Sequence, residues 1–323
     1  MLFRSAALLF ATILQAGGAT AQDCTADVEL RQQDGLRLEV AYRCRSAAAI
    51  AFTADGERMA RRVTDFADGG GQHPTPSNNA WRVESRNGVV EAKYRFDLTG
   101  YARQVDQTSS AVQRGDGALV LLSGWLLEPR GTGASPAIDI RVKTPPGLVF
   151  SSGLPKVGDA WRLAAGTNVR FVGYTAFGQL HHEEIAVPGG GTLRLAVLDG
   201  LNEGDRATVV EWVKRTAEIE ANYWQGFPSR QSLLGLVPMQ GRDGVGYGRS
   251  VPGGGPTVMV EIGAKPARAK LYNDWVLVHE WIHTGMPYVR GNATWFMEGA
   301  ATYVEPIIRA RAGWKSEIGR AHV

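Results

Sequence analysis

The sequence predicts an α+β protein in which an all-β, sandwich-like domain precedes a second domain of mixed strands and helices. Apolar and polar residues alternate with period two over most of 28–163, and Gly- or Pro-rich turns separate the alternating segments. Over 205–223 the apolar residues recur at helical spacing instead. A length of 323 residues also suits two domains better than one. We therefore expect a β-rich domain over 22–165 and a second domain over 166–316.

The individual elements follow from the same periodicity. In the first domain we expect strands at 36–43, 89–98, 118–122 and 138–142. In the second domain we expect the helix over 205–223 to be flanked by strands at 169–174, 192–198, 233–239 and 257–262.

The first residues have the features of a secretory signal, which we place at 1–21. Arg4 gives a positive start, 6–14 is an apolar core, and 19–21 offers small residues for cleavage. The apolar core is too short to span a bilayer comfortably, and no run downstream is long enough. We expect an exported protein, periplasmic or extracellular, without stable membrane insertion after signal cleavage. An uncleaved membrane anchor is the alternative.

Cys24 and Cys44 are the two cysteines of the chain, and both lie near the start of the expected mature protein. An even pair at this spacing in an exported protein predicts a disulfide. The pair lacks the ligand spacing and the partner histidine of a zinc site.

The charge of the chain argues against nucleic acid as a partner. The formal net charge is +3, and it falls when Arg4 leaves with the signal. No cluster of Lys and Arg forms a basic stripe along the sequence.

The most informative segment is a HExxH motif formed by His279, Glu280 and His283. The residues at 271–278 are mostly apolar and free of Gly and Pro, which predicts a buried helix that continues into the motif. Because residues i and i+4 lie on one helix face, the two imidazoles can point at one metal ion. Glu280 lies roughly 100° around the helix and can instead reach a metal-bound water.

A third ligand has to come from another element. Gly285 and Pro287 are expected to end the first helix, and 295–305 reads as a second helix closed by Pro306. Glu298 lies near the start of this helix, fifteen residues after His283. Two histidines, one glutamate and a water are a ligand set of catalytic zinc, so we expect one Zn²⁺ per chain. The alternative is a structural metal site or an inactive descendant of a catalytic one.

These residues resemble the gluzincin metallopeptidases, the superclass of thermolysin and aminopeptidase N. HEWIH followed by WFMEGAATY looks most like the glycyl aminopeptidase family, whose members often carry a PDZ domain. The resemblance covers 271–306 and implies a thermolysin-like catalytic domain acting on a peptide or protein substrate. It implies zinc ligands at His279, His283 and Glu298 and a general base at Glu280. A β-rich domain precedes the protease domain in that family too.

The chain departs from the family in one segment. Aminopeptidases of this superclass hold the free amino terminus of the substrate with a glutamate in a Gly-rich segment before the zinc helix. The corresponding residues here, 244–250, include no acidic residue, and Asp243 and Glu261 fit the pattern poorly. An aminopeptidase remains possible, and the choice between exo- and endopeptidase stays open.

Tyr303 and Tyr288 are candidates for contacts with the substrate. Each could donate a hydrogen bond to the oxyanion of a tetrahedral intermediate. Packing against the helices that carry the ligands is the other interpretation of each tyrosine.

The end of the chain looks incomplete for such a domain. Glu298 comes 25 residues before the last residue, which leaves no room for the helical lower lobe that closes the cleft in related enzymes. The residues at 318–323 match a common sequencing-adapter string read in frame. We hypothesise that 317–323 is an artefactual tail and that the catalytic domain over 166–316 is truncated.

Two classes of function follow. The first is an exported zinc-dependent metallopeptidase, with hydrolysis of another amide or an ester as a variant of it. The second is a non-catalytic envelope binding or scaffold protein that keeps a structural zinc site. Glu280 beside both histidines argues against the second class, because a structural site needs no base.

Overall fold

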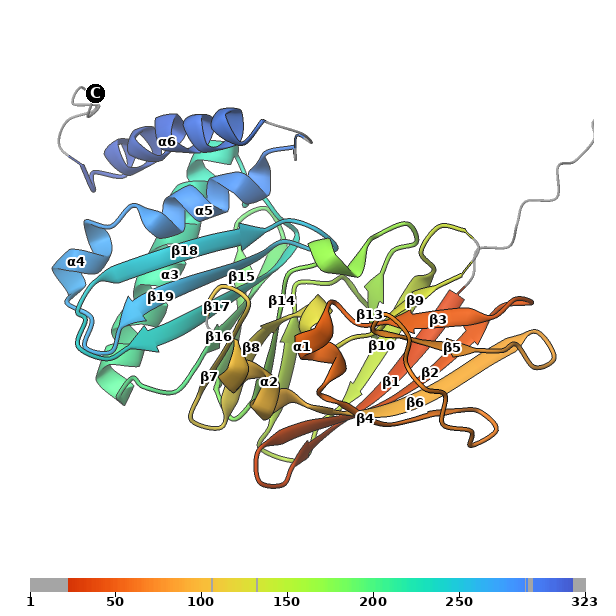
Figure 1. Cartoon of the computed structure of the whole chain (residues 1–323). Coiled ribbons are helices and arrows are strands. Elements are labelled where there is room, and N and C mark those ends of the chain that lie inside the picture. The colour runs from red at the N-terminus through yellow and green to blue at the C-terminus, as the bar shows by residue number, and fades with distance from the viewer. Residues whose placement is uncertain (1–22, 106, 132, 288, 290–292, 316–323) are drawn as a thin grey trace, which may run out of the picture.

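The computed structural model describes residues 23–315 apart from 106, 132, 288 and 290–292 (Figure 1). The expected signal at 1–21 and the expected tail at 317–323 lie outside the described residues. The N-terminal part is mostly β-sheet, and the C-terminal part carries the long helices. Among the described helices, none combines the length and the apolar character needed to cross a membrane.

The largest sheet has seven strands in the order β12-β13-β10-β1-β2-β6-β4. Its strands are β1 (Asp23–Gln32), β2 (Leu36–Arg45), β4 (Val63–Asp68), β6 (Val89–Asp97), β10 (Ala137–Lys143), β12 (Lys156–Val157) and β13 (Ala160–Leu163). Burial alternates residue by residue along β2 and β6, as the period-two pattern predicted. One face of the sheet therefore lies on the core and the other faces solvent.

Two smaller sheets complete the N-terminal core. Their orders are β5-β3-β9 and β11-β14-β8-β7. Their strands are β3 (Ile50–Thr53), β5 (Ala80–Val83), β7 (Ala111–Arg114), β8 (Gly117–Leu121), β9 (Glu128–Arg130), β11 (Val149–Ser152) and β14 (Tyr174–Gly178). The short helices are α1 (Glu57–Ala60), α2 (Leu98–Gln104), η1 (Leu122–Gly124) and η2 (Val169–Phe171). Residues of all three sheets share one apolar cluster, in which the Trp125 ring packs edge-on against Phe177.

The strand expected at 169–174 is wrong. The chain forms η2 there, and β14 begins only at Tyr174. The side chain of Asn168 accepts a hydrogen bond from the backbone N–H of Arg170, which favours a turn over an extended strand. Phe171 is 66% exposed, so the apolar residue that suggested a buried strand is not in the core.

The second part is built on a five-stranded sheet in the order β15-β16-β17-β19-β18. Its strands are β15 (His181–Val187), β16 (Gly191–Val197), β17 (Gln231–Met239), β18 (Val245–Val251) and β19 (Thr257–Gly263). The three central strands are parallel, and the edge strands β15 and β18 are antiparallel to their neighbours. The expected strands near 192–198, 233–239 and 257–262 are confirmed.

Helices cover one face of this sheet. α3 (Glu203–Trp224), which confirms the helix expected over 205–223, packs its Trp212 into the cluster that also holds Trp281 of α5 (Val276–Gly285). The opposite face packs on the four-stranded sheet of the N-terminal part, where Met259 meets Leu119. The α+β fold class, with a β-rich region followed by a mixed sheet and helices, is therefore confirmed.

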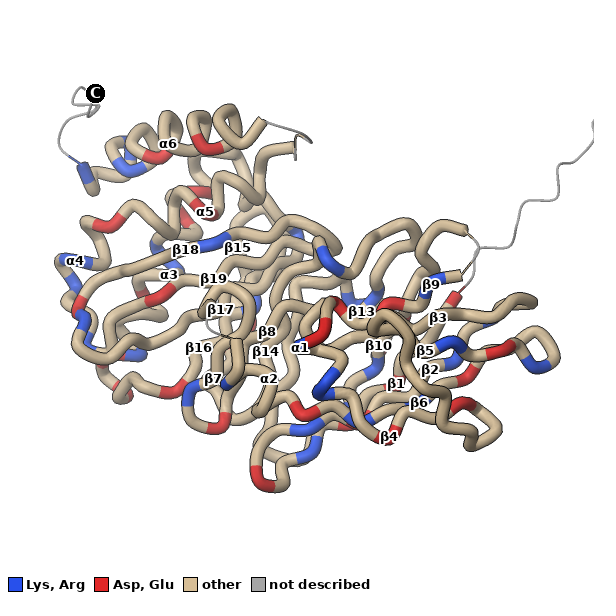
Figure 2. Tube along the Cα trace, in the orientation of Figure 1, with Lys and Arg blue, Asp and Glu red and all other residues tan. Residues whose placement is uncertain are grey.

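Charged side chains are spread over the surface (Figure 2). Lys and Arg alternate with Asp and Glu along the trace, and several pairs link neighbouring strands. One example is Arg162 with Asp139, whose Nη2 and Oδ2 atoms are 2.6 Å apart. The guanidinium of Arg162 lowers the pKa of Asp139 through its hydrogen bond. Exposed pairs of this kind contribute little to stability, so this surface reads as a solvated face.

The expected disulfide is present. Cys24 and Cys44 are directly opposed residues of β1 and β2, and their sulfur atoms are bonded. Both side chains are buried in the core of the N-terminal part. The bond closes a loop with a sequence separation of 20 residues and ties the hairpin at the centre of the seven-stranded sheet.

Removing the disulfide should destabilise the protein. The double substitution Cys24→Ala and Cys44→Ala is expected to lower the free energy of unfolding by about 3 kcal/mol, because the unfolded chain regains the entropy of an open loop. Urea unfolding followed by tryptophan fluorescence measures this change. A loss below about 1 kcal/mol would show that the loop is already restricted in the unfolded chain.

Candidate metal centre

α5 presents the HExxH motif from a buried position. Val276, Leu277 and Trp281 are buried on the side that faces the sheet and α3. Val278 and Ile282 are buried on the side that faces α6 (Thr294–Arg311). α5 thus lies between the edge of the sheet and α6, as Figure 1 shows. Its apolar residues on two sides fix its rotation about its own axis.

The start of α5 differs from the continuous helix expected from 271–278. The chain forms the short helix α4 (Arg268–Tyr272), breaks, and begins α5 at Val276. The side chain of Asp274 accepts a hydrogen bond from the backbone N–H of Val276 at 2.7 Å. The break follows because Asp274 satisfies an N–H group that the first turn of a helix leaves free.

The end of α5 and the start of α6 follow the sequence prediction, whereas the end of α6 does not. α5 ends at Gly285 as expected, and Glu298 lies in the second turn of α6. Pro306 was expected to close the second helix, but α6 continues to Arg311. The helix continues because Ile308, beyond the proline, is buried against α5 and α3, and this packing outweighs the one backbone hydrogen bond that Pro306 cannot make.

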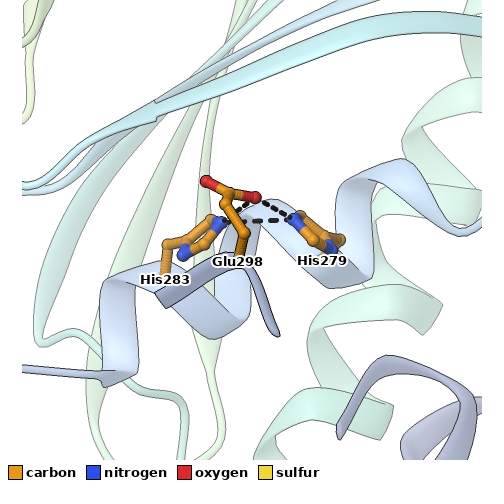
Figure 3. A group of neighbouring side chains, drawn as sticks. All are labelled: His279, His283 and Glu298. Carbon is orange, nitrogen blue, oxygen red and sulfur yellow. Dashed lines mark hydrogen bonds and ion pairs between the residues drawn. The ribbon is translucent and has the colours of Figure 1, made fainter. Parts of the chain in front are cut away.

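Three side chains converge between the two helices (Figure 3). The Nε2 atom of His279 lies 3.2 Å from Nε2 of His283 and 3.1 Å from Oε2 of Glu298. The Nε2 atom of His283 lies 3.5 Å from the same carboxylate oxygen. The sequence prediction that Glu298 faces back to the two histidines is confirmed by this arrangement.

These distances fit a small divalent cation. Ligand atoms at about 2.0–2.1 Å from a tetrahedral ion lie about 3.3 Å from one another. The three observed separations of 3.1, 3.2 and 3.5 Å bracket this value. Two imidazole nitrogens and a carboxylate oxygen are also the atom types that zinc accepts. His279, His283 and Glu298 could therefore hold a metal ion.

Both imidazoles are buried, and burial favours the neutral form of His283. His279 is 6% and His283 is 7% exposed, and burial lowers the pKa of His283. A neutral imidazole keeps the lone pair that a metal ion needs. The Nδ1 atom of each ring is buried and has no hydrogen-bond partner among the described residues. Packing instead orients the His279 ring, which meets Trp275 edge-on at a centroid distance of 5.2 Å.

Glu280 points to the edge strand rather than into the cluster. A Cβ atom placed on Gly248 of β18 would lie 2.8 Å from Cγ of Glu280, so the carboxylate arm runs along this glycine. Burial raises the pKa of Glu280 to about 7, and hydrogen bonds from Ser250 oppose this rise. A carboxyl group with a pKa near neutrality can both accept and release a proton.

Gly248 and Ser250 were read in the sequence only as part of a segment without acidic residues. Their signal was the pair of small residues at alternate positions of a strand, Gly248 and Ser250. Small residues at such positions mark a close approach of another element. In the structure that element is α5 with Glu280.

The two acidic residues nearest to this segment lie elsewhere. Both carboxylate oxygens of Asp243 bind Nζ of Lys270 at 2.7 Å. Glu261 alternates along β19 with Val260 and Ile262, which pack on the helix-covered face of the sheet, so Glu261 points to the opposite face. The described residues of β18 therefore offer no carboxylate beside the cluster.

The two tyrosines receive no support as oxyanion donors. Tyr303 is 73% exposed and lies on the face of α6 opposite to its buried residues Ala301 and Glu305. It neither faces the cluster nor packs against α5. Tyr288 lies outside the described residues.

Comparisons with known proteins place the fold. No family model and no curated protein sequence matches the chain. An aminopeptidase N family protein from Idiomarina loihiensis matches with a TM-score of 0.62 at 14% identity, over 90% of this chain and 55% of that one. A two-domain M1 zinc metallopeptidase mutant bound to L-tryptophan matches with a TM-score of 0.50 at 15% identity, over 91% of this chain and 71% of that one.

A third match is an M1 zinc metallopeptidase mutant from Deinococcus radiodurans bound to a Tyr-Ser-Ala substrate. Its TM-score is 0.50 at 14% identity, and the match covers 91% of this chain and 71% of that one. The chain is thus similar in fold to M1 zinc metallopeptidases. It spans just over half the length of the aminopeptidase N family protein.

The cap at Asp274 should make stability depend on pH. Burial raises the pKa of Asp274 to about 6 from its ordinary value of 3.8, against the opposing effect of the Val276 hydrogen bond. Protonation of Asp274 therefore stabilises the folded protein. This contribution to stability is complete below pH 3.8 and is lost as the pH rises through 6. Asp274→Asn keeps the acceptor without the charge, so it should resist urea better than the unchanged protein at pH 7.5.

The comparison is made by urea unfolding with a chelator present, at pH 7.5 and near pH 4. The advantage of Asp274→Asn should shrink towards pH 4, where the aspartate is protonated. An advantage of equal size at both pH values would contradict a buried, ionisable cap.

Proposed function

We propose that this protein is a zinc-dependent metallopeptidase. The observation that carries the proposal is the convergence of three ligand atoms at tetrahedral separations, with a carboxylate on the next residue of the same helix. His279 and His283 from α5 and Glu298 from α6 would hold one Zn²⁺ per chain. The fold similarity to M1 zinc metallopeptidases supports this class.

The bound zinc would polarise the peptide carbonyl and lower the pKa of a coordinated water. Glu280 would accept the proton that the attacking water releases as the water oxygen bonds to the carbonyl carbon. The same carboxyl group then gives the proton to the amide nitrogen as the carbon–nitrogen bond breaks. A pKa near 7, raised by burial, suits both transfers. Ser250 keeps the carboxylate of Glu280 oriented through its hydrogen bonds.

A peptide substrate fits the edge of the five-stranded sheet. Among the described residues, β18 is an edge strand that pairs only with β19, so one row of its backbone groups is open to an extended chain. This strand also contacts Glu280 at Gly248, which places a bound peptide beside the general base. The absence of a carboxylate from the described part of β18 leaves exo- and endopeptidase activity both open.

We also propose that the protein is exported, to a periplasmic or extracellular location. The predicted signal and the Cys24–Cys44 disulfide support this location, because disulfides persist in oxidising compartments. The interspersed surface charges support a peptide partner rather than a nucleic acid.

Glu280→Gln should abolish hydrolysis without loss of the metal. The amide keeps the shape of the side chain but accepts no proton, so kcat should fall by about a hundred- to ten-thousand-fold. Zinc content, measured by elemental analysis, should stay near one ion per chain. His283→Ala is the control, because it should lose both zinc and activity. Comparable hydrolysis by Glu280→Gln would contradict the proposed base.

Gly248→Ala should displace the carboxylate of Glu280 from the side of β18. The added Cβ would lie 2.5 Å from Cγ1 of Val276 and 2.8 Å from Cγ of Glu280, so these atoms have to move. We expect kcat to fall by about ten- to a hundred-fold with zinc content unchanged.

Gly244→Ala is the matched control on the same hairpin, because its Cβ meets only Lys270 at an ordinary 3.6 Å. It should leave kcat unchanged. Equal effects of the two substitutions would show that the contact with Glu280 does not matter for catalysis.

A further inference from the structure

A buried arginine joins the far end of α6 to the start of α5. Arg309 is 5% exposed, and its Nη2 atom donates a hydrogen bond to the carbonyl oxygen of Asn273 at 2.7 Å. Its Nη1 atom donates to Oε1 of Glu305 at 2.6 Å. Asn273 directly precedes Asp274, whose side chain begins α5. One guanidinium therefore contacts α6 and the short connection that leads from α4 into α5.

The hydrogen bond between Arg309 and Glu305 spans the turn of α6 that contains Pro306. Pro306 lacks an N–H group, so the carbonyl of Thr302 loses its helical donor at this turn. The pair of Glu305 and Arg309 is spaced i, i+4 and spans the proline on the buried side of the helix. It ties the half of α6 that holds Glu298 to the half that is anchored on Asn273.

The other contacts between the described residues of the two helices are largely apolar and set the position along the axis less sharply than hydrogen bonds do. Val278 and Ile282 of α5 meet Ala301 and Ile308 of α6 in a small apolar cluster. Apolar burial is non-directional, so it resists separation of the helices better than it resists sliding. A planar guanidinium that donates from Nη1 to one acceptor and from Nη2 to another holds the two acceptors at a fixed separation.

That position matters at the other end of α6. Glu298 lies eleven residues before Arg309, about 16 Å along the helix. Its side chain is 55% exposed, so few contacts of its own hold it against the two buried histidines. An axial shift of α6 would move the carboxylate of Glu298 relative to the two imidazoles.

We propose that Arg309 is a positioning residue for the metal site. By binding Asn273 and Glu305 together, it fixes α6 along α5 and holds Glu298 at ligand distance from His279 and His283. This inference rests on the proposed function only in that the three side chains bind zinc.

The test measures zinc affinity by competition with a chromogenic chelator. Arg309→Lys keeps the positive charge beside Glu305. Its single ammonium group cannot reproduce the two guanidinium hydrogen bonds to Glu305 and Asn273. We expect it to weaken zinc binding by about ten- to a hundred-fold, the range for groups that orient metal ligands. Arg311→Lys is the matched control, because Arg311 is an exposed arginine on the same helix and the same change there should leave the affinity unaltered.

A second variant separates positioning from stability. Ile308→Ala removes buried apolar contacts between the helices and should lower Tm without weakening zinc binding more than about twofold. The visible spectrum of the cobalt(II)-substituted protein reports the ligand geometry directly. Arg309→Lys should change this spectrum, and Ile308→Ala should not.

The outcomes are distinct. Zinc affinity of Arg309→Lys equal to that of the unchanged protein would overturn the inference, as would an equal loss of affinity in Ile308→Ala. An unchanged protein that binds zinc but cleaves no peptide in a library digest would overturn the proposed function alone. An unchanged protein that binds no zinc would overturn both.

Discussion

The rotation of α5 between the sheet and α6 is the constraint on which the rest of the site depends. Trp281 and Leu277 face the sheet, and Val278 and Ile282 face α6. With these two apolar sides buried, His279 and His283 lie beside the residues that face α6, and Glu280 lies on the remaining side of the helix. Successive residues differ by about 100°, so His279 turns to α6 while its neighbour turns to β18. A rotation of the helix would turn the histidines away from Glu298 and Glu280 away from β18.

The same burial determines the charge states of the site. Removing water lowers the pKa of His283 and raises the pKa of Glu280, because both shifts disfavour a charged form. Neutral imidazoles are the form that binds a metal ion, and a carboxyl group near neutrality is the form that can exchange a proton. The apolar frame that positions α5 thus also prepares the protonation states of its polar residues. The burial of α5 therefore determines both the positions of these side chains and the pKa shifts of His283 and Glu280.

Local patterns in the sequence predicted much of this structure, and contacts between distant segments account for what they missed. Period-two and helical periodicities located most strands and α3, and the HExxH spacing with Glu298 located the cluster. The turn at Asn168, the break at Asp274 and the continuation of α6 through Pro306 were not predicted. Each depends on a side-chain hydrogen bond or on packing against another helix, which periodicity does not report.

The three side chains that could hold a metal ion are fixed with very different firmness. His279 and His283 share one buried helix, so their spacing is set by the backbone, whereas Glu298 comes from a second helix and its side chain is largely exposed. The affinity for a metal ion then depends mainly on how firmly the second helix is placed. An apolar residue at this position would have a lower desolvation cost than the buried arginine but could not link the two segments by hydrogen bonds. Arg309 contributes a fixed distance between two helices, and the weakest ligand of the site is the one that needs it.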